Sequence, residues 1–281
     1  MKRVLCLILC LTLLLCCGCG ASEQELPAET QTAEQDQLPH EQEPAESAVQ
    51  EQTEEEVPAM EEPVEEEIPA VSHVVVIDPG HQITGNFEQE PNGPGSSEMK
   101  NKVSSGTQGQ FTGLPEYELN LQVGLQLRDE LEARGYTVYM TRETNEVDIS
   151  NVERAQFAGE VGGEILVRIH ANGSNDPSVS GAMTICQTPS NPYQNQYEAS
   201  RLLSDCVLAE YCAATGMIPE MVWETDTMTG INWAEIPSTI VEMGYMTNQS
   251  DDTQMADPEF QKLIVQGIAN GIDRYFSELA E

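Results

Sequence analysis

The chain is poor in basic and aromatic residues and in histidine. Lys and Arg together number 12 of 281 residues against 48 Asp and Glu, so the formal net charge is −36. This balance argues against nucleic-acid binding, because phosphate contacts need Lys and Arg. The sequence also lacks a His-Glu-x-x-His motif, which excludes the metallopeptidases that carry their zinc ligands on one helix. The apolar run at 4–15 is shorter than the roughly 20 residues of a membrane-spanning helix.

The first 21 residues have the pattern of a secretory signal peptide. Two basic residues precede the apolar run, and small residues with cysteine follow it. The end of the segment resembles the bacterial lipoprotein box, in which a cysteine is lipidated and becomes the first mature residue. We expect lipidation at Cys19, with Cys16 and Cys17 as alternatives, because a leucine usually stands where Cys16 is. The competing interpretation is an ordinary signal peptide that is cut and releases a secreted protein.

Residues 22–72 form an acidic segment rich in Glu and Pro. It has seventeen Asp or Glu, no Lys or Arg and no aromatic residue. Such a composition cannot bury enough apolar surface to offset the entropy of ordering, so we expect a disordered linker. It would either tether an anchored domain that reaches into the cell wall or act as a plain solvated spacer.

Residues 73–281 are expected to form one α/β domain. Apolar runs typical of strands alternate with helical patterns, which predicts a mainly parallel twisted sheet flanked by helices on both faces. The segment at 82–115 is rich in Gly, Pro, Asn and Ser and is expected to be a long loop that covers or borders a site. The expected strands lie at 74–77, 137–142, 165–170, 181–186 and 238–243, and the clearest helices at 116–131, 197–213 and 258–279.

Three polar side chains stand at the ends of expected strands. His81 and His170 are two of the four histidines and follow apolar runs, and Glu242 lies near the end of another. Ligands bind at the carboxyl ends of strands in α/β sheets. Zinc hydrolases use three protein ligands and a carboxylate that deprotonates water. These residues predict a metal site of His81, His170 and Glu116 or Glu118, with Glu242 as base; structural histidines are the competing interpretation.

Six short motifs follow one another along 73–281, and together they resemble the zinc-dependent N-acetylmuramoyl-L-alanine amidases of the amidase-3 family. The resemblance implies one Zn²⁺ bound by His81, Glu116 and His170, with Glu242 polarising water and shuttling its proton. It favours Glu116 over Glu118, since the family glutamate usually stands five residues before a leucine, here Leu121. The motifs are Val-Ile-Asp-Pro-Gly-His81, Pro-Glu116-Tyr-Glu-Leu-Asn-Leu, Met-Thr-Arg142, Glu-Arg154-Ala, Arg-Ile-His170-Ala-Asn and Val-Glu242-Met-Gly-Tyr-Met-Thr-Asn248.

The function implied by the resemblance is peptidoglycan hydrolysis outside the cytoplasmic membrane. The substrate would be the amide between N-acetylmuramic acid and the L-alanine of the stem peptide. Two alternatives are a non-catalytic wall-binding or regulatory module of the same fold and a zinc peptidase that cuts within the stem peptide. The expected partners are peptidoglycan and, through the lipid anchor, the cytoplasmic membrane.

Several other residues near the motifs have two interpretations. For Asp78 we favour a turn residue before proline over a group that orients the neighbouring histidine. For Arg142 and Arg154 we favour structural ion pairs over substrate contacts. Asn172 and Asn248 are expected near the site, either in turns or in contact with substrate.

Overall fold

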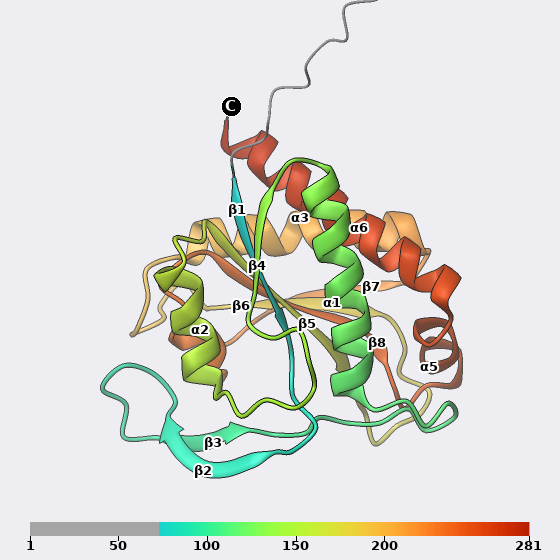
Figure 1. Ribbon diagram of the computed structural model, residues 1–281, viewed down its shortest axis with the longest axis horizontal. Coiled ribbons are helices and arrows are strands. Elements are labelled where there is room, and N and C mark those ends of the chain that lie inside the picture. Colours follow the sequence, from blue (N-terminus) through green and yellow to red (C-terminus); the bar gives the residue numbers. More distant parts are fainter. Residues whose placement is uncertain (1–72, 281) are drawn as a thin grey trace, which may run out of the picture. The chain divides into compact units, whose positions relative to one another are not determined.

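The computed structural model describes residues 73–280, so the expected signal peptide, the lipidation site at Cys19 and the linker at 22–72 lie outside the described residues. A six-stranded sheet in the order β4-β1-β5-β8-β6-β7 forms the centre of the domain (Figure 1). Every neighbouring pair is parallel except β6 with β8. The strands are β1 (Val74–Pro79), β4 (Thr137–Met140), β5 (Ile165–Asn172), β6 (Ala182–Cys186), β7 (Pro219–Glu224) and β8 (Ser238–Tyr245).

Helices cover both faces of this sheet, because alternate residues of a buried strand point to opposite sides. On β1, Val75 and Ile77 join the larger core under α1 (Glu116–Ala133), α3 (Tyr197–Thr215) and α6 (Pro258–Leu279). Val76 joins a smaller core on the other face, under α2 (Asn151–Glu160) and near α4 (Thr229–Asn232). The predicted fold class is therefore confirmed. Within residues 73–280, no helix has both the length and the apolar character needed to cross a bilayer.

Helix boundaries follow local capping chemistry. Ser150 accepts a hydrogen bond from the backbone of Glu153, and the Glu153 side chain bonds back to Ser150, which is a capping box at the start of α2. Asp257 caps α6, and Pro258 occupies its first turn. Asn248 is the N-cap of the short helix α5 (Gln249–Met255), where its side chain accepts two backbone hydrogen bonds.

The prediction of a long loop at 82–115 is wrong over much of its length. The segment contains an antiparallel hairpin of β2 (Asn86–Pro91) and β3 (Met99–Val103), drawn in cyan below the sheet in Figure 1. The edge strand β7 was not predicted either. Both regions are largely exposed, so they need little apolar sequence and give no alternating hydrophobic pattern.

Candidate metal centre

Three side chains from different parts of the chain converge where β1 and β5 end. His81 Nε2 lies 3.0 Å from Glu116 Oε1 and 3.1 Å from His170 Nδ1, and this His170 nitrogen lies 3.2 Å from the same Glu116 oxygen. Glu116 is the first residue of α1. Within residues 73–280, this is the one group of His, Cys, Asp or Glu side chains placed to hold a metal ion. The structure thus brings together the three residues that the sequence selects as ligands.

The arrangement fits a small tetrahedral cation. Ligand atoms about 2.0 Å from a Zn²⁺ ion are about 3.3 Å apart at the corners of a tetrahedron, close to the distances observed here. Nδ1 of His81 lies 2.9 Å from the carbonyl oxygen of Ser104. A carbonyl only accepts hydrogen bonds, so this nitrogen carries a proton, which leaves Nε2 as the atom of His81 that would face a metal ion.

Glu116 is held in its ionised form in a buried position. Its second carboxylate oxygen accepts a hydrogen bond from the backbone nitrogen of Thr107 at 2.8 Å, and the first also accepts one from Ala171. Burial by itself would raise the pKa of Glu116, but hydrogen bonds with His170 and His81 outweigh it and hold the pKa well below the usual value. Glu118 is not part of this group, and its side chain accepts a hydrogen bond from Gln122 instead, so Glu116 is the carboxylate that fits.

Glu242 stands beside the three ligands on the next strand. Its Cα pairs with that of His170 in the β5–β8 register, and both side chains line one cavity. Oε2 of Glu242 is buried and has no hydrogen-bond partner among the described residues. Burial, with a smaller contribution from the charge of Glu116, raises the pKa of Glu242 to about 8. Two neighbouring carboxyl groups with pKa values pushed in opposite directions are the usual arrangement for acid–base chemistry.

Glycines allow the chain to approach the cluster closely. A Cβ at Gly80 would lie 2.2 Å from the His170 ring, and one at Gly106 would lie 2.6 Å from Glu116 Oε2. Gly106 also has φ of +81°, which side chains rarely adopt. The cavity has a volume of about 530 Å³. Gly106, Thr107 and Gln110 line part of it, so the end of the 82–115 segment borders the site as expected.

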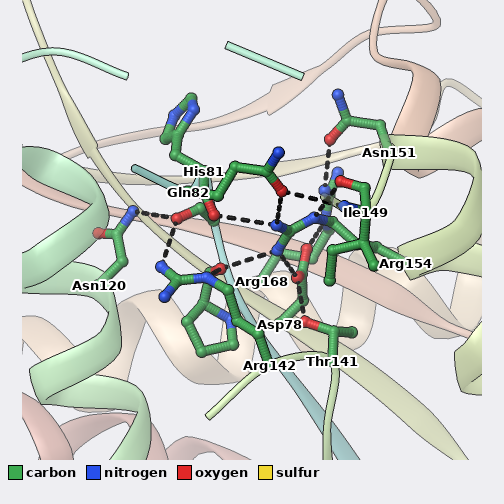
Figure 2. A network of polar contacts seen from close by, with 12 residues as sticks. Asp78, His81, Gln82, Asn120, Thr141, Arg142, Ile149, Asn151, Arg154 and Arg168 are labelled. Carbon is green, nitrogen blue, oxygen red and sulfur yellow. Dashed lines mark hydrogen bonds and ion pairs between the residues drawn. The ribbon is translucent and has the colours of Figure 1, made fainter. Parts of the chain in front are cut away.

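A network of arginines lies behind the cluster and fixes the turn that carries His81 (Figure 2). The buried carboxylate of Asp78 accepts hydrogen bonds from Arg154 and Arg168, each at 2.7 Å, and one from Thr141. Burial would raise the pKa of Asp78, but the two guanidinium groups outweigh it and hold the pKa far below the usual value. Asp78 is therefore an ion-pair residue, and neither of its two predicted roles describes it.

The two arginines singled out in the sequence differ in their partners. Arg154 forms the predicted structural ion pair with Asp78. Arg142 instead donates to backbone oxygens, among them those of Pro79 and Gly80, and it forms no ion pair with any acid in residues 73–280. The prediction of an ion pair for Arg142 is wrong. Both side chains nevertheless support the turn before His81.

Sequence reasoning missed Ser104, Thr107 and Arg168. Ser104 and Thr107 contribute backbone groups, which leave no signature in side-chain types. Arg168 did give a signal, because it is the one charged residue in the apolar run at 165–169. Of the two asparagines, Asn172 lines the cavity, whereas Asn248 is a helix cap that lines a different hollow.

Comparison with known proteins finds similarity to N-acetylmuramoyl-L-alanine amidases. The sequence model of the Amidase_3 family, described as N-acetylmuramoyl-L-alanine amidase, matches residues 75–274. N-acetylmuramoyl-L-alanine amidase Rv3717 of Mycobacterium tuberculosis is 28% identical over 206 residues, which cover 71% of this chain and 84% of that protein. The probable cell wall amidase LytH of Staphylococcus aureus is 26% identical over 203 residues, covering 72% and 58%.

A solved structure has the same architecture. The crystal structure of the N-acetylmuramyl-L-alanine amidase Ami1 from Mycobacterium smegmatis matches with a TM-score of 0.66 and 28% identity, covering 73% of this chain and 97% of that one. The family match spans the sheet, its helices and all four residues of the candidate site. This chain therefore belongs to the N-acetylmuramoyl-L-alanine amidase family Amidase_3.

Proposed function

We propose that this protein hydrolyses the amide between N-acetylmuramic acid and the L-alanine of the stem peptide in peptidoglycan, with one Zn²⁺ held by His81, Glu116 and His170. The observation that carries the proposal is the convergence of three ligand atoms from distant parts of the chain, with the unpartnered carboxyl of Glu242 beside them. Family membership supports the same substrate.

Each residue of the site has a distinct task. Zinc, when bound there, acts as a Lewis acid and lowers the pKa of a coordinated water to about 7. Ser104 and the Arg154 network hold the His81 ring and its turn in place. A positive ion beside Glu242 would lower the pKa of its carboxyl and let it accept a proton from the attacking water. Glu242 then returns this proton to the nitrogen of the departing alanine.

The decisive experiment is a digest of purified peptidoglycan by the zinc-loaded protein, followed by identification of the new chain ends. New amino groups on L-alanine, with intact muramic acid, are the expected products. New ends farther along the stem peptide would indicate a zinc peptidase. An absence of new ends from a protein that contains a full equivalent of zinc would indicate a non-catalytic module.

The location follows from the N-terminal sequence and is part of the proposal. We place the protein outside the cytoplasmic membrane, anchored through a lipid on Cys19, with 22–72 as a linker to the catalytic domain at 73–281. Metabolic labelling with a palmitate analogue tests the anchor. The label should enter the wild type and be absent from Cys19→Ala; label retained in that variant would move the lipid to another cysteine.

A further inference from the structure

A second, smaller cavity adjoins the candidate metal centre. It has a volume of about 250 Å³ and shares His81, His170 and Glu242 with the larger cavity. Its other walls come from the start of α2, the middle of β5, the segment around α4 and β8, namely Asn151, Arg168, Met228, Thr229, Gly230 and Ile240. We call it the Arg168 cavity. A substrate whose reacting bond lies at His170 and Glu242 can therefore extend into two compartments.

Arg168 is the one cation in the lining of this cavity, and its guanidinium is fixed in place. The side chain is buried, with 3% exposed. Nε donates to Asp78 at 2.7 Å and Nη2 donates to Asn151 at 2.9 Å, as Figure 2 shows. Within the described residues, Nη1 makes no hydrogen bond. A Cβ on Gly230 would lie 1.6 Å from Nη1, so glycine at this position makes the space that the guanidinium occupies.

The surrounding charges leave this guanidinium short of negative partners. Arg142, Arg154 and Arg168 are all buried around Asp78, the one carboxylate in the described domain that forms an ion pair with any of them. Buried charges are costly unless they are paired and hydrogen-bonded. An arginine that lines a cavity and has one nitrogen without a hydrogen-bond partner in residues 73–280 is well suited to bind a carboxylate, because its planar donors match carboxylate oxygens.

We propose that the Arg168 cavity binds the free α-carboxylate of the glutamate that follows L-alanine in the stem peptide. This rests on the proposed function, and it adds a group that the enzyme recognises beyond the bond it cuts. The peptide side of that bond is the source of the anion, because the lactyl carboxyl on the sugar side is consumed in the amide itself.

The spacing supports this choice. Arg168 lies two residues before His170 on β5, so their Cα atoms are about 6.6 Å apart at about 3.3 Å per residue. An extended peptide advances by about 3.3–3.6 Å per residue, so about two residue lengths span this separation. A carboxylate that lies about two residue lengths from the reacting amide is then level with Arg168 when the stem peptide runs back along β5 from His170.

The test uses two muropeptides that differ only at this α-carboxyl, which is free in one and amidated in the other. We expect the wild type to favour the free acid at least tenfold in kcat/KM, because hydrogen bonds to charged groups contribute about 1.5–3 kcal/mol. Arg168→Gln should bring the ratio close to one. A purely structural role for Arg168 would lower both rates together and leave the ratio unchanged.

A matched pair at Met228 tests the cavity while leaving Arg168 in place. Met228→Glu puts an acid in the lining of the cavity and should abolish the preference for the free acid, whereas Met228→Gln has similar size and should keep it. A ratio measured on one preparation does not depend on how much of the protein is folded. Equal kcat/KM for the two substrates in the wild type, or the same ratio in both Met228 variants, would overturn the proposal.

Affinity measurements distinguish a failure of the carboxylate site from a failure of the proposed function. The affinities of both muropeptides for Glu242→Gln are measured by calorimetry. If the wild type cuts neither substrate but this variant binds the free acid at least tenfold more tightly, the function fails and the carboxylate site stands. If it binds both equally, the carboxylate site fails, whatever the activity.

Discussion

Two carboxyl groups on β1 and β8, the strands on either side of β5 in the sheet, have opposite surroundings. Asp78 on β1 has both oxygens bonded, to two arginines and a threonine, and its pKa is held far below the usual value. Glu242 on β8 has a buried oxygen with no hydrogen-bond partner in residues 73–280, and its pKa is raised to about 8. The first carboxylate is fully bonded within the fold, whereas the second has one oxygen that no described group bonds.

The largest effect is expected from Glu242→Gln, which keeps the shape of the side chain and removes its acid–base function. The value of kcat should fall by about 10²–10⁴-fold, the usual contribution of a general acid or base. Zinc content by elemental analysis should stay at the wild-type value. Glu118→Gln is the matched control on α1 and should keep full activity. Wild-type turnover by Glu242→Gln would remove this residue from the mechanism.

Asp78→Asn tests the other half of the comparison and should act on stability. Removing one partner from a buried ion pair leaves uncompensated charge and costs about 3–5 kcal/mol. Urea unfolding at pH 7 measures this loss. Glu242→Gln should not lose stability, because its buried oxygen has no hydrogen-bond partner to lose in the described part of the chain. The exposed acid in Asp129→Asn is a control that should change little. Equal losses in Asp78→Asn and Glu242→Gln would show that the two carboxyl groups do not differ as described.

Zinc should stabilise the folded protein through the three ligands. A ligand at 100 times its dissociation constant adds about 2.7 kcal/mol to the free energy of unfolding. His170→Ala should lose this gain and its bound zinc. His73→Ala is the control, because His73 pairs with Glu164 at the far end of β1 and should keep the full gain. A His170→Ala variant with a full equivalent of zinc would contradict the ligand assignment.

A smaller effect is expected when the stability contributed by Asp78 is measured at lower pH. The pKa of Asp78 is lower in the folded than in the unfolded protein, so its stabilising effect is present above pH 4 and decreases as the pH falls toward the folded-state pKa. The difference in unfolding free energy between wild type and Asp78→Asn should therefore shrink by about 1 kcal/mol between pH 5 and pH 3. A constant difference over this range would mean that the Asp78 pKa is not lowered by folding.

Much of the fold could be predicted because buried strands and helices leave clear hydrophobic patterns in the sequence. The strands β1, β5 and β8 are almost entirely buried, and each carries a run of apolar residues, since strands in the middle of such a sheet are covered on both faces. Exposed elements such as the β2–β3 hairpin and β7 could not be predicted in this way. Their side chains face solvent, and their pairing rests on backbone hydrogen bonds that any sequence can make.

The sequence by itself determined which side chains stand at the strand ends, because an apolar run that stops at Asp-Pro-Gly-His81 or at His170 places the histidine there through local geometry alone. Only the tertiary structure decided what surrounds each group. Asp78 meets Arg154 and Arg168 across 76 and 90 residues of chain, and no acceptor reaches Nη1 of Arg168 or donor reaches Oε2 of Glu242 in the described domain. Charge state and reactivity depend on burial and on partners from distant segments, and these exist only once the sheet has assembled.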